Sequence, residues 1–145
     1  MSELQSVAEF RASLGLPVAG SAKDKSTLIK LVISGQQPIW GINKGTAGVS
    51  ADALNKLNED AKCCNPKGTG LSPYALTHAE ADSIFQAYQK MIMASTAVMY
   101  CDRPLCDNCM KTVANILCLI GTVTLTWIGP NEARTGYVSY KFTAP

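Results

Sequence analysis

The spacing of hydrophobic residues changes repeatedly along the chain between a helical period and a strand period of two. Helical spacing, with cap residues at the ends, predicts helices over 2–14, 50–62, 77–92 and 103–121. Alternating spacing, bounded by glycine, proline and polar residues, predicts strands over 27–34, 38–43, 95–102, 122–129 and 137–142. The short "GQQ" turn between the first two strands indicates a hairpin.

Strands that alternate with helices predict an α/β fold, with helices on both faces of a partly antiparallel sheet. We find no internal repeat and no low-complexity tract, so we expect a single domain over 1–145. Within it, 1–26 would form an N-terminal helix and loop, and 27–142 the core.

Composition narrows the class of protein only slightly. Of 145 residues, 47% are hydrophobic and 17% charged, which favours a compact globular chain over a disordered one. A net charge of +2 neither requires nor excludes a nucleic-acid partner. No apolar run approaches the roughly 18 residues of a membrane span, and the N-terminus has no signal-peptide block. We therefore expect no membrane association and no targeting segment within the chain itself.

The only histidine, His78, lies in the stretch "LTHAEADSIF" at the start of the third predicted helix. Thr77 and Glu80 have the spacing of a capping box, which would make Glu80 a local helix-capping residue. The alternative is that Glu80 turns into a pocket and does chemistry, and we favour it because of the cysteines downstream.

Cys106 and Cys109 form a C-x-x-C at the start of the fourth predicted helix. Their spacing puts both sulfurs on one helix face, and a helix N-terminus favours thiolates. With His78 they make three ligands, the number typical of a catalytic zinc that keeps one position for water. A redox pair is the alternative, but it leaves His78 and Glu80 unexplained.

An H-x-E segment followed by C-x-x-C resembles the cytidine-deaminase superfamily. The segments "IWGINKG", "MYCDRPLCDNC" and "TLTW" are similar to deaminase domains at the C-termini of bacterial polymorphic toxins. One departure is that Leu105 separates Pro104 from Cys106, whereas the family pattern joins proline directly to cysteine.

The resemblance implies a cytidine-deaminase-like α/β/α sandwich with a mixed five-stranded sheet. It also implies Zn²⁺ on His78, Cys106 and Cys109, with Glu80 as proton shuttle in the hydrolysis of cytosine to uracil. The expected substrate is DNA, single-stranded in preference to duplex. Double-stranded DNA, RNA, free nucleosides and a non-catalytic zinc-stabilised binding module are the alternatives. The resemblance further implies a monomeric toxic domain of a larger secreted bacterial protein, which acts in a recipient cell's cytoplasm and is neutralised by a cognate immunity protein.

For substrate contacts the resemblance indicates Asn43, at the end of the second strand. Trp40 and Tyr100 are candidates for stacking on a base, and Ala79 lies between His78 and Glu80. Lysines in predicted loops could contact phosphate or could simply be solvated; these are Lys44, Lys62 and Lys67.

The other four cysteines suit structural roles. Cys63 and Cys64, in a predicted loop, could pack, bridge to another cysteine or act as extra ligands. Cys101 and Cys118 are predicted to be small buried core residues.

Overall fold

The computed structural model of the chain describes residues 2–43, 51–64 and 78–144. Its helices are α1 (Glu3–Ser13), α2 (Ala51–Cys64), α3 (Ala79–Gln89), α4 (Asp107–Ile116) and the 3₁₀ helix η3 (Leu117–Ile120). Its strands are β1 (Leu28–Val32), β2 (Ile39–Ile42), β3 (Thr96–Cys101), β4 (Thr124–Pro130) and β5 (Tyr137–Thr143). In the described residues, no helix is both long and apolar enough to cross a membrane.

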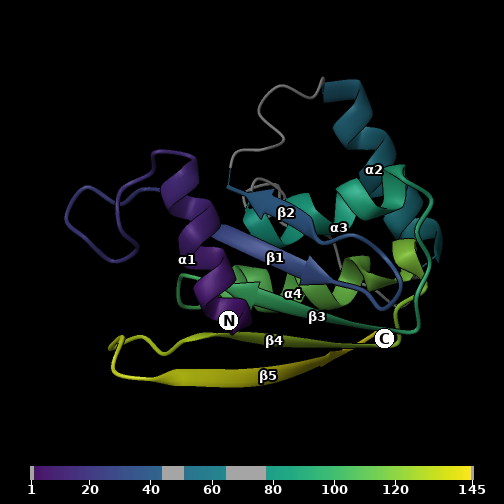
Figure 1. Cartoon of the computed structure of the whole chain (residues 1–145). Helices are drawn as coiled ribbons and strands as arrows, with labels where there is room; N and C mark the ends of the chain where they lie inside the picture. Colours follow the sequence, from purple (N-terminus) through teal and green to yellow (C-terminus); the bar gives the residue numbers. More distant parts are fainter. Residues whose placement is uncertain (1, 44–50, 65–77, 145) are drawn as a thin grey trace.

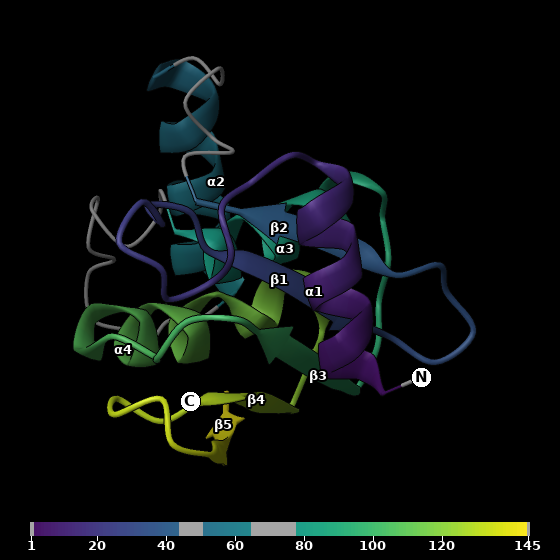
Figure 2. The same ribbon diagram turned by 60° about the vertical axis from the view of Figure 1, so that its left-hand side comes forward.

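The five strands form one mixed sheet in the order β2-β1-β3-β4-β5. β1 pairs antiparallel with β2 and with β3, β3 runs parallel to β4, and β5 returns antiparallel to β4. Helix α1 lies on one face of this sheet, whereas α3 and α4 lie on the other (Figures 1 and 2). The predicted α/β fold with a mixed five-stranded sheet is thus confirmed.

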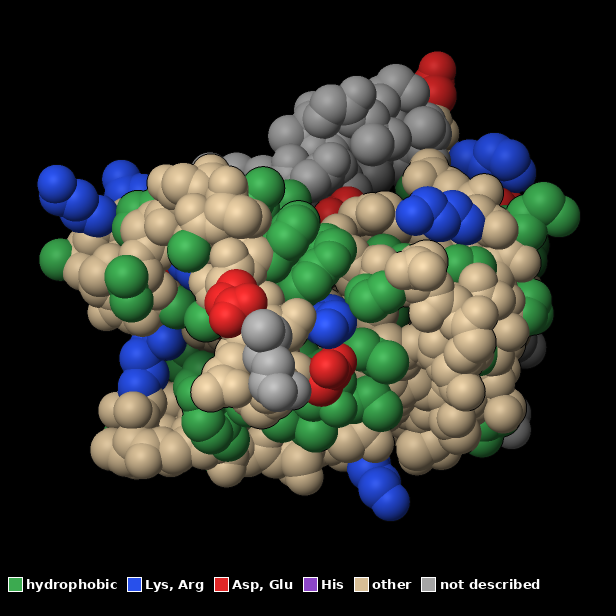
Figure 3. Space-filling view, in the orientation of Figure 1, with side chains coloured by type: hydrophobic (Ala, Val, Ile, Leu, Met, Phe, Trp, Pro, Cys, Tyr) green, Lys and Arg blue, Asp and Glu red, His purple; other side chains and the backbone are tan. Residues whose placement is uncertain are grey.

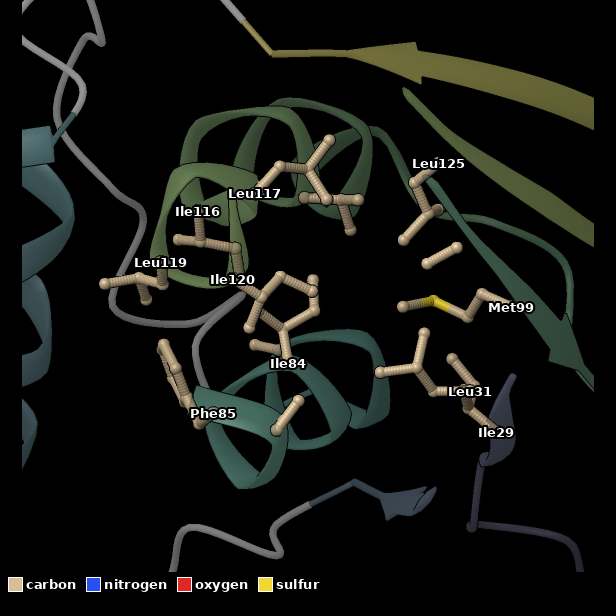
Figure 4. Packing of buried hydrophobic residues seen from close by; sticks show 14 of the residues in the cluster. Ile29, Leu31, Ile84, Phe85, Met99, Ile116, Leu117, Leu119, Ile120 and Leu125 are labelled. Atoms are coloured by element: carbon tan, nitrogen blue, oxygen red, sulfur yellow. The ribbon is translucent and has the colours of Figure 1, made fainter. Parts of the chain in front are cut away.

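Alternation along β1 explains the two faces. Ile29 and Leu31 have no exposed surface and point into the main core (Figure 4). Figure 4 shows their neighbours there, which include Met99 of β3, Ile84 and Phe85 of α3, and Leu117 and Ile120 of η3. Each such buried side chain contributes about 1.5–3 kcal/mol of hydrophobic free energy. Lys30, between them, points to the opposite face, where its Nζ lies 3.0 Å from Ser6 Oγ of α1.

The N-terminal helix is capped as the sequence predicts. Ser2 Oγ accepts a hydrogen bond from the Gln5 amide at 3.1 Å, and Gln5 Oε1 accepts one from the Ser2 amide at 2.9 Å. These reciprocal bonds satisfy two of the amide groups that a helix start leaves without partners. The packed side of α1 includes Val7 and, unexpectedly for a charged residue, Arg11.

Two helix starts differ from prediction. The N-cap of α3 is His78, and its side chain makes no capping bond; the predicted cap, Thr77, lies outside the described residues. Helix α4 begins at Asp107, after Pro104, because the residue before a proline is driven away from helical geometry. Cys106 therefore directly precedes this helix instead of lying within its first turn.

A disulfide joins Cys64, at the end of α2, to Cys118 in η3, with the two Cα atoms 5.7 Å apart. The prediction that Cys118 is a simple core residue is therefore wrong, and Cys63 and Cys64 lie in the last turn of a helix instead of in a loop. A cross-link over 54 residues removes enough freedom from the unfolded chain to stabilise the fold by about 4 kcal/mol. Because its sulfur is in this bond, Cys64 cannot serve as an additional thiolate ligand.

Candidate active site

The candidate site lies at the edge of the sheet where β3 ends and α3 and α4 begin (Figure 1). In parallel α/β units this edge collects helix N-termini from different parts of the chain. His78 arrives there as the residue before α3, and Cys106 as the residue before α4. The chain thus brings together two potential metal ligands that are 28 positions apart.

The closest pair of potential ligands is His78 Nδ1 and Cys106 Sγ, which lie 3.5 Å apart. Imidazole nitrogen and cysteine sulfur are both preferred donors for zinc, and two ligands of one tetrahedral ion lie about this far apart. Cys109 lies in the first turn of α4, but its side chain is outside the described part of the structure. Among described side chains, no group of three His, Cys, Asp or Glu residues is placed to hold a metal. The His78–Cys106 pair nevertheless suits zinc by its chemistry and its spacing.

Glu80 forms part of the same pocket, which has a volume of about 200 Å³. Its lining residues are Thr27, Asn43, His78, Ala79, Glu80, Arg103, Pro104 and Cys106. Glu80 is only 4% exposed, yet it borders this cavity beside the two potential ligands. The structure therefore brings together three of the four residues predicted to carry the chemistry.

The buried thiol of Cys101 lies close to the Glu80 carboxylate. Its Sγ lies 3.8 Å from Glu80 Oε1, and the residue is 1% exposed. Burial raises the pKa of the Cys101 thiol well above its ordinary value, and the nearby Glu80 carboxylate raises it further. The thiol stays protonated, and its acceptors are the Arg103 carbonyl oxygen at 3.3 Å and, more distantly, Glu80 Oε1. Cys101 is a core residue, as predicted, but alternation along β3 did not reveal this contact.

Asp82 ties the start of α3 to the edge strand β2. Its Oδ2 accepts hydrogen bonds from the Ile42 amide at 2.9 Å and from Gln86 Nε2 at 3.1 Å. Gln86 also donates to the Trp40 carbonyl at 2.8 Å. Burial raises the pKa of Asp82, and the two hydrogen bonds only partly oppose that rise. These contacts satisfy polar groups of an edge strand and hold α3 in register with it.

Gly41 allows β2 to approach α3 closely. A Cβ atom at this position would overlap the Ala79 carbonyl oxygen and would lie 2.9 Å from the Ser83 amide nitrogen. The Ala79 oxygen and the Ser83 nitrogen both belong to the backbone of α3, so neither can move aside without distorting the helix. A glycine here therefore permits the packing that positions His78 and Glu80.

We expect Gly41→Ala to lower the free energy of unfolding by about 1–3 kcal/mol, the usual cost of overpacking. Urea denaturation followed by circular dichroism would measure the change. Gly136→Ala is the matched control, because a Cβ there would come no closer than 4.0 Å to its nearest neighbour. Equal stabilities for Gly41→Ala and wild type would contradict the close packing described here.

The predicted substrate contacts divide between the two faces of the sheet. Asn43 and Ala79 line the pocket. The Asn43 side chain is engaged locally, because its Oδ1 accepts from the Thr27 amide at 2.9 Å and its Nδ2 donates to the Lys25 carbonyl at 3.0 Å. Ala79 has no exposed surface. A direct contact between Asn43 and substrate remains a prediction.

Trp40 and Tyr100 are not brought to the pocket. Both pair with Lys30 across the sheet, and Lys30 points toward α1, on the side away from α3. The Trp40 ring stacks on Phe10 of α1, with ring centroids 4.1 Å apart. Neither residue is therefore placed to stack on a base held beside Glu80. Of the lysines considered for phosphate contact, Lys62 is exposed on α2, whereas Lys44 and Lys67 lie outside the described residues.

A buried arginine that the sequence analysis did not single out supports the loop leading to Cys106. Arg11 is 2% exposed, and its guanidinium forms ion pairs with Asp24 and with Asp102 Oδ2, the latter at 2.8 Å. It also donates to the carbonyls of Pro17 and Ser26. Burial raises the pKa of Asp102. Hydrogen bonds from the Leu28 amide and from Arg11 lower this pKa, but they only partly offset the effect of burial. Burial also acts to raise the pKa of Asp24, but bonds from Gly20, Ser26 and Arg11 outweigh it and lower the value.

Comparison with known proteins supports the resemblance noted from the sequence. The model of the MafB19-like deaminase family matches residues 5–122, which includes most of α1 and all the candidate ligands. Neither the curated proteins nor the solved structures gave a significant match.

Proposed function

We propose that this chain, which belongs to the MafB19-like deaminase family, is a zinc-dependent hydrolase that converts cytosine to uracil in single-stranded DNA. The family supports hydrolytic deamination, and the proposal adds the metal, the base and the polynucleotide. The observation that carries it is the contact between His78 Nδ1 and Cys106 Sγ at 3.5 Å, in the same small pocket as Glu80.

The metal would be held by His78, Cys106 and Cys109. Bound zinc supplies Lewis acidity that lowers the pKa of a water molecule toward neutrality. The donor set has the nitrogen and sulfur character that zinc prefers. Cys64 is excluded as a fourth protein ligand by its disulfide, which leaves Cys63, a free thiol, as the other cysteine considered for that position.

Glu80 would carry the proton. Its carboxylate would take one proton from the attacking water and give it to the ring nitrogen of the base, and would then take the second proton from the new C4 hydroxyl and give it to the departing amine. A carbon–oxygen bond forms at C4 of cytosine, the carbon–nitrogen bond breaks, and ammonia leaves. The Cys101 thiol lies beside this carboxylate, and the buried surroundings limit competing water.

The size of the pocket supports an extruded or single-stranded base over one paired in a duplex. About 200 Å³ accommodates one pyrimidine and its water, whereas a stacked and paired base has its C4 covered. Duplex DNA, RNA and free nucleosides are the competing substrates, and comparing the conversion of each distinguishes between them.

The biological setting is also proposed. By its resemblance to toxin deaminases, the chain would be the toxic domain of a larger secreted bacterial protein, which acts in a recipient cytoplasm and is restrained by an immunity protein. A structural disulfide is typical of chains that pass through oxidising compartments, which supports secretion.

The test is to incubate the purified, zinc-loaded chain with four substrates: single-stranded DNA, duplex DNA, RNA and free cytidine. Sequencing of the polymers and chromatography of the nucleoside would measure conversion. We expect C-to-T changes chiefly in single-stranded DNA. Zinc-loaded protein that converts none of the four would refute the proposal.

Cys106→Ala is expected to remove most of the bound zinc, because two remaining ligands hold the ion weakly. Metal analysis after dialysis against a weak chelator would measure zinc per chain. Cys63→Ala is the matched control, because that thiol is exposed and is not in a disulfide. Zinc content that falls equally in both variants would place the metal elsewhere.

A further inference from the structure

A second and larger cavity, of about 500 Å³, lies on the α1 side of the sheet. It lies between α1 and the turn that joins β4 to β5, and its walls include Leu16, Val18, Asp102, Pro130, Arg134 and Tyr137. Asp102 lines this groove, and the next residue, Arg103, lines the catalytic pocket. Consecutive residues of the loop after β3 thus line the two cavities.

Arg134 is placed at the groove by a backbone conformation that does not suit its residue type. Its φ of +55° lies in the left-handed region, where glycine is favoured and other residues are strained. The turn is fixed by Asn131, whose carbonyl accepts from the Arg134 amide at 3.0 Å. The Arg134 side chain lies against Gly20, and its Nη1 donates to the Asp102 carbonyl at 3.2 Å. An arginine at a position that favours glycine indicates that the side chain itself is used.

Arg103 provides a second cation on the pocket side of Asp102. Its side chain is 36% exposed, and its Nη2 is 3.6 Å from Asp24 Oδ2, a long separation for an ion pair. Arg103 Nη2 also donates to the Asp24 carbonyl at 3.3 Å, and the Asp24 carboxylate is shared between Arg103 and the buried Arg11. Figure 3 shows Lys and Arg side chains along the left edge of the molecule, over the loop after α1 and near the β4–β5 turn.

Tyr137 adds an aromatic surface to the same groove. It is 67% exposed although it stands at the start of β5, opposite Pro130. Proteins hold single-stranded nucleic acid with basic residues that contact the phosphates and with exposed aromatic rings on which the bases stack. Much of the groove wall is aliphatic, and Arg134 and Tyr137 supply the cation and the aromatic ring that suit a single strand.

We propose that the groove between α1 and the β4–β5 turn holds the single-stranded polynucleotide next to the target base. Arg103 and Arg134 contact its phosphates, and Tyr137 stacks on a neighbouring base. This inference rests on the proposed function for its substrate class, but binding of a strand can be measured apart from deamination.

The main test uses Arg134→Gly. At φ +55° glycine relieves backbone strain, so we expect an unchanged or higher Tm, while affinity falls about five- to tenfold through loss of a charge-assisted contact. The probe is a fluorescent oligothymidylate of about 12 nucleotides, a length that a single domain can cover, with binding followed by anisotropy. Because one phosphate contact is lost, the slope of log K against log salt should shrink by about 0.7.

Two further variants and one control complete the test. Tyr137→Ala should weaken binding, whereas Tyr137→Phe should retain it, because only the ring is needed for stacking. Lys141→Gln removes the same charge from an exposed position on β5 and should leave affinity nearly unchanged. Arg134→Gly that binds as tightly as wild type, or wild type that fails to bind at low salt, would overturn the inference, as would a loss equally large in Lys141→Gln.

Failure of the groove and failure of the proposed function give different results. If the protein deaminates single-stranded DNA but Arg134→Gly leaves KM unchanged, the function stands and the groove is refuted. If oligothymidylate binds in an Arg134-dependent way but no cytosine is converted, the groove stands and the function is refuted. A groove that instead captures a protein partner would show no Arg134-dependent binding of the oligonucleotide, which also refutes the inference.

Discussion

Glu80→Gln is expected to lower kcat for cytosine deamination by about 10²–10⁴-fold, the usual contribution of a general acid–base group. Glutamine keeps the size of the side chain and an oxygen for the Cys101 thiol, 3.8 Å away in the wild type, but it cannot take the water's proton. The proposed zinc ligands are untouched, so metal content and thermal stability should stay near those of the wild type. Single-turnover assays on a single-stranded oligonucleotide would measure the rate.

The control for this variant is Glu9→Gln, an exposed acid on α1 far along the chain from the pocket. It should deaminate as fast as wild type. If Glu80→Gln keeps its activity and its zinc, another group moves the proton and our assignment fails. If it loses zinc as well as activity, Glu80 supports the metal site, and its effect cannot be read as proton transfer alone.

Arg11→Met is expected to lower the free energy of unfolding by about 3–5 kcal/mol, because removing one partner of a buried ion pair leaves uncompensated charge. Two carboxylates depend on this guanidinium, since Asp24 and Asp102 both pair with it. Methionine has a similar volume but no charge. The loss in free energy of unfolding therefore comes mainly from the lost ion pairs and hydrogen bonds of Arg11, and little of it from an empty cavity. Urea denaturation would measure it.

Two companion variants test whether the loss of stability comes from the ion pairs of Arg11. Lys23→Met removes an exposed charge and should change stability little. A triple variant, in which Arg11→Met is combined with Asp24→Asn and Asp102→Asn, should recover part of the loss because it no longer buries unpaired carboxylates. A single Arg11→Met variant as stable as wild type would show that the network contributes nothing.

Three residues of the candidate site could be brought together from the sequence, because each lies at or next to a helix start whose position in the fold can be predicted. His78 and Cys106 both precede amphipathic helices that follow strand or loop signals, and α/β topology brings such helix starts to one edge. The pairing of imidazole, thiols and carboxylate then indicates zinc chemistry without knowledge of any distance. That logic needs only local sequence and connectivity.

The residues that prediction misplaced are those whose environment depends on tertiary contacts. Alternation puts Trp40 and Gly41 on opposite faces of β2, but it does not say which face α3 covers. The close approach of Gly41 to Ala79 settles it and turns Trp40 toward Phe10. Arg11 shares a helical stripe with Val7, so its burial could have been suspected, whereas its partners Asp24 and Asp102 come from distant segments. The partner of Cys64 was equally hidden, because spacing does not determine disulfide connectivity.

The bond between Cys64 and Cys118 closes a covalent ring in the chain. His78, Glu80, Cys106 and Cys109 all lie inside that ring, whereas Arg11 and Arg134 lie outside it. A single proteolytic cut between His78 and Cys106 therefore leaves both ligands in one molecule while the ring is oxidised. After reduction the same cut puts them on separate polypeptides, which only noncovalent packing then holds together. The resistance of the candidate site to nicking is thus set by the redox state of two cysteines that do not line its pocket.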